Sequence, residues 1–136
     1  RVVVRESLAN GGGGLWVRAA FLQVRESTFV DNRANFAGPA ILADGDNNIW
    51  VVNSTFAANG SNNPGFGAIQ QQVGANQKGI LRLRNVTLAD SSHVGVRNFA
   101  FTGGDALLEV RNSIFARNPV HSPPFQEATH WPFKTR

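Results

Sequence analysis

The chain has 136 residues, the length of one domain, and its hydrophobic share of 42% is compatible with a packed core. Only 16% of the residues are charged, while glycine and asparagine each occur 14 times, a mixture that fits short strands joined by many turns rather than helices. The absence of cysteine excludes disulfides and thiolate metal sites, and no stretch of the sequence is long and apolar enough to span a membrane.

The net charge is +4, and 11 of the 13 basic residues are arginine. This basic excess weakly favours an anionic partner such as acidic polysaccharide, with nucleic acid as a less favoured candidate, although a solubilising surface is the simpler explanation. The sequence has neither an initiator methionine nor a signal peptide, so we expect it to belong to a longer protein.

One short motif recurs along the chain. Its clearest copies span residues 22–32, 49–59 and 108–118, a looser copy spans 81–91, and a truncated copy opens the chain at 2–8. Aligned on a shared serine or its equivalent, the copies are marked by Ser7, Ser27, Ser54, Val86 and Ser113, which follow one another at unequal intervals. A fixed motif with variable spacing is typical of a solenoid of strands, because insertions are accommodated in turns.

Each copy begins with a strand whose side chains alternate between an aliphatic face and a mostly polar face. The two inward columns are Val2, Leu22, Ile49, Leu81 and Leu108, followed by Val4, Val24, Val51, Leu83 and Val110. A second short strand directs Phe29, Phe56, Leu88 and Phe115 inward. A third strand follows a glycine turn at residues 14–17, 40–43, 68–71 and 95–98.

Two corner columns separate the strands. The first contains Glu6, Glu26, Asn53, Asn85 and Asn112, and the second contains Asn32, Asn59, Ser91 and Asn118. Asparagines stacked from coil to coil bond to one another and to the turn backbone. We therefore predict structural ladders at Asn53, Asn85, Asn112, Asn32, Asn59 and Asn118.

These columns predict an all-β fold, a right-handed parallel β-helix of about five coils with three short strands per coil. Residues 1–118 form the coils. Residues 119–136 form an irregular cap or exit segment, because their prolines lack the donor that a ladder needs. Both ends look open to continuation, so further coils of the same protein or neighbouring subunits are expected partners.

The second strand and its corner repeat a Phe-x-x-Asn pair, and several third strands begin with a sequence similar to Gly-Gly-Ala-Ile. The pairs are Phe29/Asn32, Phe56/Asn59 and Phe115/Asn118, and the strand starts are at 13–15, 38–41 and 67–69. These motifs resemble the repeats of chlamydial polymorphic membrane proteins and, more broadly, secreted parallel β-helix proteins of the pectate-lyase-like fold. The resemblance implies export and display at a cell surface, most commonly for adhesion, while the enzymes of that fold cleave polysaccharides along one exposed sheet face.

A column of outward arginines is the clearest candidate for a binding site. It contains Arg5, Arg25, Arg84 and Arg111, is interrupted by Val52, and has Arg82 beside it. In this alignment Arg5 and Arg25 lie one coil apart, as do Arg84 and Arg111. Such a stripe matches the charge repeat of an acidic glycan. The simpler alternative is that each arginine pairs with a nearby glutamate or with water and discourages aggregation.

Trp16 and Trp50 also occupy outward positions and are further candidate ligand contacts. An exposed tryptophan stacks on sugar rings or fills an interface. The alternative for Trp50 is a covering loop formed by residues 59–66.

Catalytic and metal sites have little support in the sequence. The only candidates for a catalytic carboxylate pair are Glu6 and Glu26, which the alignment places one coil apart. Asp44-Gly-Asp46 resembles half of a calcium loop, which makes calcium the one cofactor to consider, although turn capping is the simpler role. The three histidines are widely separated, and we predict no metal site.

We therefore expect an extracellular or cell-surface module that is non-catalytic and serves adhesion, scaffolding or the binding of an acidic polysaccharide or cell-surface glycan. The first alternative is part of a carbohydrate-active enzyme, a polysaccharide lyase or a glycoside hydrolase, which clustered carboxylates on one outer sheet would favour. The second alternative is a structural repeat of a filament or surface appendage.

Overall fold

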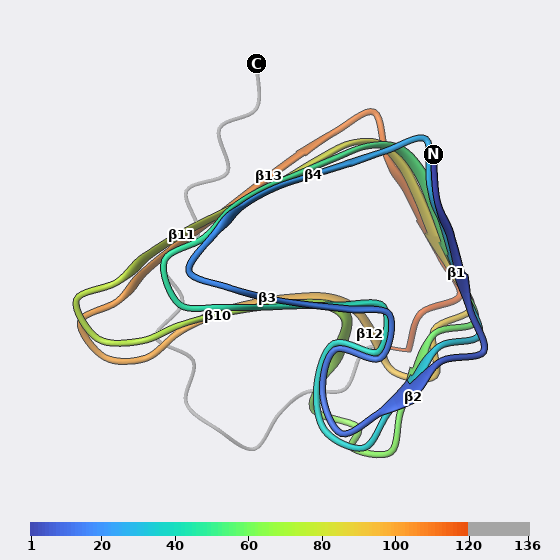
Figure 1. Ribbon diagram of the computed structural model, residues 1–136, viewed down its shortest axis with the longest axis horizontal. Coiled ribbons are helices and arrows are strands. Elements are labelled where there is room, and N and C mark those ends of the chain that lie inside the picture. Colours follow the sequence, from blue (N-terminus) through green and yellow to red (C-terminus); the bar gives the residue numbers. More distant parts are fainter. Residues whose placement is uncertain (120–136) are drawn as a thin grey trace.

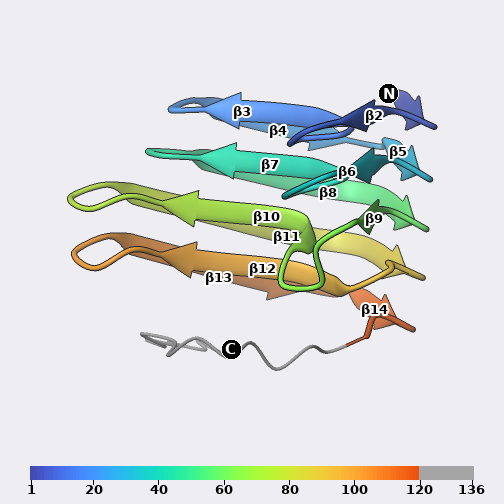
Figure 2. The same cartoon turned by 90° about the horizontal axis from the view of Figure 1, so that it is seen from below.

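A computed structural model describes residues 1–119, and every regular element in that range is a β-strand. The strands stack in parallel into a β-solenoid of about four turns, with three strands per turn. Figure 1 shows the solenoid along its axis and Figure 2 shows it from the side. The chain runs clockwise in Figure 1 while receding from the viewer, so the solenoid is right-handed.

The predicted fold class is therefore confirmed. There are about four turns rather than five, because the first and last copies of the repeat each form only part of a coil. The cap or exit segment predicted for 119–136 lies, from residue 120 onward, outside the described residues.

Two sides of the solenoid share one sheet that bends at a corner. The first side contains β4 (Phe21–Arg25), the first halves of β8 (Asn48–Ala57) and β11 (Lys78–Ala89), and β13 (Asp105–Arg111). The second side contains β1 (Val3–Arg5), β5 (Thr28–Val30), the second halves of β8 and β11, and β14 (Ile114–Ala116).

The remaining strands form two further sheets. The small sheet contains β2 (Leu8–Ala9), β6 (Arg33–Ala34) and β9 (Gly60–Ser61). The third side of the solenoid is formed by β3 (Leu15–Arg18), β7 (Ile41–Asp44), β10 (Gly67–Val73) and β12 (Val94–Ala100). The register predicted for these third strands is confirmed, since Leu15, Ile41, Ile69 and Val96 lie side by side.

The core fills the space between the three sides with columns of like side chains. Phe29 and Phe56 stack with ring centroids 4.9 Å apart, and Leu88 continues this column. Ile49 and Val51 are fully buried in the two aliphatic columns. A coil has no core of its own, so this coil-to-coil burial is what stabilises the fold.

The chain turns the corners through residues with left-handed backbone. At the first corner Glu26, Asn53, Asn85 and Asn112 have φ between 46° and 53°. At the second corner Glu6, Asp31, Ala58, Asp90 and Arg117 have φ between 50° and 56°. Asparagine adopts this conformation more readily than most residues, which explains its frequency at the first corner.

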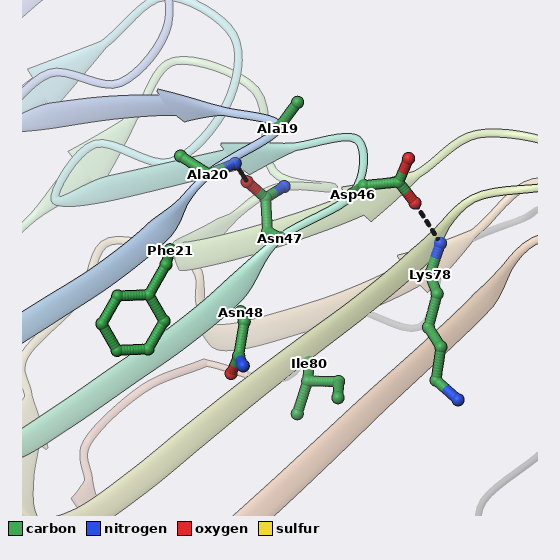
Figure 3. Close-up of a pocket in the computed structure, with 8 residues that line it drawn as sticks. All are labelled: Ala19, Ala20, Phe21, Asp46, Asn47, Asn48, Lys78 and Ile80. Atoms are coloured by element: carbon green, nitrogen blue, oxygen red, sulfur yellow. Dashed lines mark hydrogen bonds between the residues drawn. The ribbon is translucent and has the colours of Figure 1, made fainter.

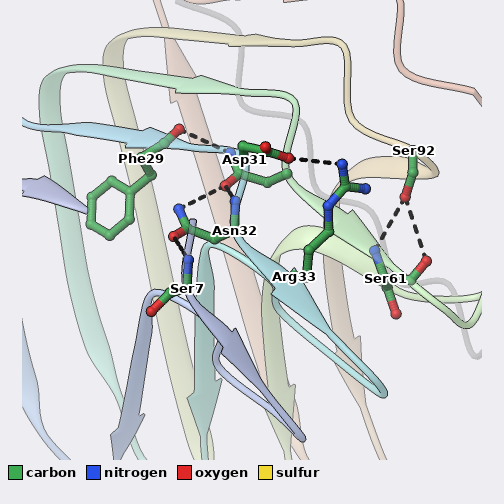
Figure 4. A network of polar contacts seen from close by, with 8 residues as sticks. Ser7, Phe29, Asp31, Asn32, Arg33, Ser61 and Ser92 are labelled. Atoms are coloured by element: carbon green, nitrogen blue, oxygen red, sulfur yellow. Dashed lines mark hydrogen bonds and ion pairs between the residues drawn. The ribbon is translucent and has the colours of Figure 1, made fainter. Parts of the chain in front are cut away.

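Buried asparagines hold the second corner together (Figure 4). The Oδ1 atom of Asn32 accepts the Ser7 N–H at 3.2 Å, and Asn59 Oδ1 accepts both the N–H and the Nδ2 of Asn32, at 3.1 and 2.9 Å. At the end of the column, Asn118 Oδ1 accepts the Ser91 N–H in the same way. The predicted ladder is thus confirmed here, and at the first corner Asn85 Nδ2 donates to Asn53 Oδ1 at 2.8 Å.

The alignment of the first copy is wrong. Arg5 pairs with Val30 and Val4 with Phe29, so Val3–Arg5 occupies the second strand of a coil rather than the first. Ser7 accordingly lies beside Asn32 in the asparagine column, not beside Ser27. The physical reason is length, because the alignment on Ser7 left too little chain before Ser27 for three strands and their turns.

Ser91 interrupts the buried asparagine ladder, and its Oγ atom is buried without a hydrogen-bond partner in the described part of the chain. We predict that Ser91→Asn raises the free energy of unfolding by about 1 kcal/mol, because the new amide would repeat the bonds that Asn59 makes one coil earlier. Thermal and urea unfolding of the two proteins would measure the change. A lower stability for the variant would contradict the ladder as described.

Candidate functional site

The outer face of the first side gathers most of the predicted binding residues. Its strands β4, β8, β11 and β13 bring Arg25, Val52, Arg84 and Arg111 into register, and we call this set the basic row. One pleat away along the same strands lie Gln23, Trp50, Arg82 and Glu109. The face is thus built from positions of β-strand alternation that point away from the core.

The basic row carries charge that has no ion-pair partner in the described part of the chain. Among residues 1–119, no carboxylate lies within 4.0 Å of Arg25, Arg84 or Arg111. Arg84 and Arg111 occupy adjacent strands about 4.8 Å apart, where two like charges repel by up to about 1 kcal/mol in water. An anion bound between the two guanidinium groups would replace this repulsion with charge-assisted hydrogen bonds.

Arg82 differs from the basic row, because its guanidinium group contacts other side chains of the same sheet. Its Nε donates to Glu109 Oε2 at 2.9 Å, its Nη1 donates to Asn48 Oδ1 at 2.9 Å, and its guanidinium stacks 4.9 Å from the Trp50 ring centroid. Trp50 Nε1 also donates to Asn48 Oδ1, at 3.1 Å. These contacts hold the Trp50 ring in place while 38% of the residue stays exposed.

A hollow of about 360 Å³ opens at the other end of the same face (Figure 3). Ala19, Ala20, Phe21 and Ile80 provide its apolar lining, and Asp46, Asn47, Asn48 and Lys78 its polar lining. Phe21, Asn48 and Ile80 sit side by side on β4, β8 and β11. Phe21 is 65% exposed, so its ring is available to a ligand.

Two predicted ligand residues lie elsewhere. Arg5 belongs to β1 on the second side, where it pairs with Val30, and is not one coil from Arg25 as predicted. Trp16 is 60% exposed, as expected of an outward residue, but it belongs to β3 on the third side. The segment 59–66 does not provide the cover that was the alternative for Trp50. It forms β9 in the small sheet and the loop that follows.

The candidate carboxylate pair is also separated. Glu26 lies at the first corner and Glu6 at the second, where the register of β1 and β5 makes Asp31 its neighbour. Asp31 pairs with Arg33 at 2.7 Å. Glu6 and Glu26 therefore do not form the adjacent pair that the sequence alignment implied.

Within residues 1–119, no three His, Cys, Asp or Glu side chains gather closely enough to hold a metal ion. The two aspartates of the calcium-like turn are otherwise engaged. Asp44 pairs with Arg18 at 3.5 Å, and Asp46 Oδ1 accepts the Lys78 N–H at 2.7 Å. At the second corner, hydrogen bonds from the Arg117 guanidinium hold the pKa of the exposed Asp90 carboxyl below its ordinary value.

Sequence reasoning missed Phe21 and the hollow beside it. The sequence did indicate that Phe21 points outward, because it precedes the inward Leu22 by one residue in the same strand. A third asparagine ladder was missed as well. Asn62 Nδ2 donates to Asn35 Oδ1 and Asn35 Nδ2 to Asn10 Oδ1, both at 2.9 Å, on the exposed loops after the small sheet.

The part of the chain that the structure describes contains no helix able to cross a membrane. Comparison of the chain with protein-family models, with curated proteins and with solved structures found no match in any of the three.

Proposed function

We propose that this chain is a non-catalytic module that binds an acidic glycan, displayed in an extracellular or cell-surface protein. The observation that carries the proposal is the basic row, in which three exposed arginines face solvent without a carboxylate partner among residues 1–119. Trp50 beside the row offers an aromatic surface for a sugar ring.

The architecture supports display. A solenoid is rigid along its axis and offers long exposed faces on which charge repeats from coil to coil. The Phe-x-x-Asn and Gly-Gly-Ala-Ile-like repeats, which resemble those of polymorphic membrane proteins and pectate-lyase-like β-helices, favour the same setting. The dispersed carboxylates Glu6 and Glu26 give the enzyme alternative no comparable support.

We predict that Arg84→Ala combined with Arg111→Ala lowers the affinity for polygalacturonate about tenfold at low salt, equivalent to about 1.4 kcal/mol. Binding by wild type should weaken at high salt, because exposed charges are screened. Dextran, which is uncharged, should not bind through this row. Isothermal titration of both proteins with both polymers would measure these effects.

The matched control is Arg5→Ala combined with Arg18→Ala, which removes the same charge from the other two sides of the solenoid. This control should retain most of the affinity. Equal losses in the two double variants would mean that net charge, not the basic row, governs binding. Tight binding to DNA without binding to any acidic polysaccharide would contradict the choice of ligand.

A further inference from the structure

We propose that the hollow beside Phe21 is a second subsite that takes an uncharged sugar, so that the ligand is a glycan containing both neutral and acidic residues. This inference rests on the proposed function and deepens it. It follows from three features of the face: the lining of the hollow, the change of charge along the strands, and the distance from the hollow to the basic row.

The lining of the hollow suits a sugar ring. Phe21, Ile80 and Ala20 offer an apolar surface for the ring's C–H groups, and the lining also includes the amide of Asn48 and the carboxylate of Asp46 (Figure 3). A few polar groups around a mostly apolar surface are the usual composition of a small-molecule site. The acetamido methyl group of an amino sugar would fit the same apolar lining.

The charge changes along the strands. Near the hollow, Lys78 pairs with Asp105 at 3.5 Å, and Asp46 adds a further negative charge. In the middle of the face Arg82 and Glu109 neutralise each other. At the far end the basic row carries three positive charges. An acidic group is therefore disfavoured in the hollow and favoured at the basic row.

The distance between the two ends fits a short oligosaccharide. Ile80 and Arg84 are four residues apart on β11, which corresponds to about 13 Å of strand. Trp50 lies between them on the adjacent strand. A short stretch of glycan lying along the strands, across the solenoid rather than along its axis, would place one ring in the hollow, pass over Trp50 and present its carboxylate to Arg84 and Arg111.

The experiment compares two polymers. Hyaluronan alternates an acidic sugar with an acetamido sugar, whereas polygalacturonate contains acidic sugars only. Phe21→Ala is expected to weaken hyaluronan binding about fivefold and to leave polygalacturonate affinity unchanged, because polygalacturonate has no uncharged sugar to occupy the hollow. Phe21 is exposed, so its loss should not affect folding. Trp16→Ala, which removes an exposed aromatic from the third side, should change neither affinity.

The outcomes distinguish a failure of the second subsite from a failure of the proposed acidic-glycan function. Phe21→Ala could weaken the binding of both polymers equally or of neither, while the Arg84 and Arg111 variant still loses affinity. In that case the second subsite is wrong and the acidic-glycan function stands. If wild type binds neither polymer, both are wrong.

Discussion

Replacing Phe56 with alanine is expected to lower the free energy of unfolding by about 3–5 kcal/mol, which is the usual loss for a large buried aromatic. Phe56 is 0% exposed and lies in the middle coil, where its ring stacks on Phe29 with an interplanar angle of 8°. The substitution would leave a cavity between Phe29 and Leu88, and each coil depends on its neighbours for burial.

Urea unfolding followed by circular dichroism would measure this loss. Phe36→Ala is the control, because Phe36 is exposed. The free energy of unfolding of this variant should stay within about 0.5 kcal/mol of wild type. Phe56→Leu should cost less than Phe56→Ala, since leucine fills the same column at Leu88. Equal stability of the Phe56 and Phe36 alanine variants would contradict the stacked core.

Replacing Asn59 with alanine is expected to cost about 3 kcal/mol, although the side chain is polar. Its Oδ1 accepts two hydrogen bonds from Asn32, and its Nδ2 donates to Phe29 O at 3.0 Å. Asn59 is 1% exposed, so the substitution would remove three buried hydrogen bonds, although Asn32 Nδ2 would keep its bond to Val4 O. Each buried group left without a partner costs about 1–3 kcal/mol, and entry of water would recover part of the sum.

Asn35→Ala is the matched control for Asn59→Ala. Asn35 also takes part in two side-chain ladder bonds, with Asn10 and Asn62, but these bonds are exposed to solvent. Its loss should change the stability by no more than about 0.5 kcal/mol. If urea unfolding gave the same small change for both variants, burial would not be what makes the inner ladder important.

Much of this fold could be predicted from sequence because equivalent positions in successive coils carry residues of the same type. Period-two alternation placed Leu22, Ile49, Leu81 and Leu108 in one column, and the structure pairs them in that register. The repeated Phe-x-x-Asn pair likewise located the inner ladder, since phenylalanine and asparagine each occupy one fixed position beside the second corner.

The first copy was misaligned because its sequence matches a segment other than the one it pairs with in the structure. Val4-Arg-Glu-Ser7 matches Val24-Arg-Glu-Ser27 residue for residue, yet the chain places it beside Phe29-Val-Asp-Asn32. A strand as short as β1 carries little register information of its own. The interval from Ser7 to Ser27, shorter than any between the later copies, was the one sequence feature that indicated the error.

The candidate site was predictable in part. Outward parity identified Arg25, Arg84, Arg111 and Trp50, and the structure brings these residues onto one face. The engagement of Arg82 by Glu109 and Trp50 depends on side-chain conformation, which the sequence pattern does not contain. The hollow was missed for a similar reason, because it forms where two turns meet the start of three strands.

Nuclear magnetic resonance titration of the protein with a short oligogalacturonate tests the central claim most directly. Trp50 lies one pleat from the basic row, with its indole N–H bonded to Asn48, and Trp16 lies on the third side, so these two tryptophans report on different faces of one molecule. We expect the Trp50 indole and the amides around Arg84 and Arg111 to shift with saturation, while the Trp16 indole stays in place. Shifts confined to Trp16 and the third side, or no shifts at all, would contradict the binding face that we propose.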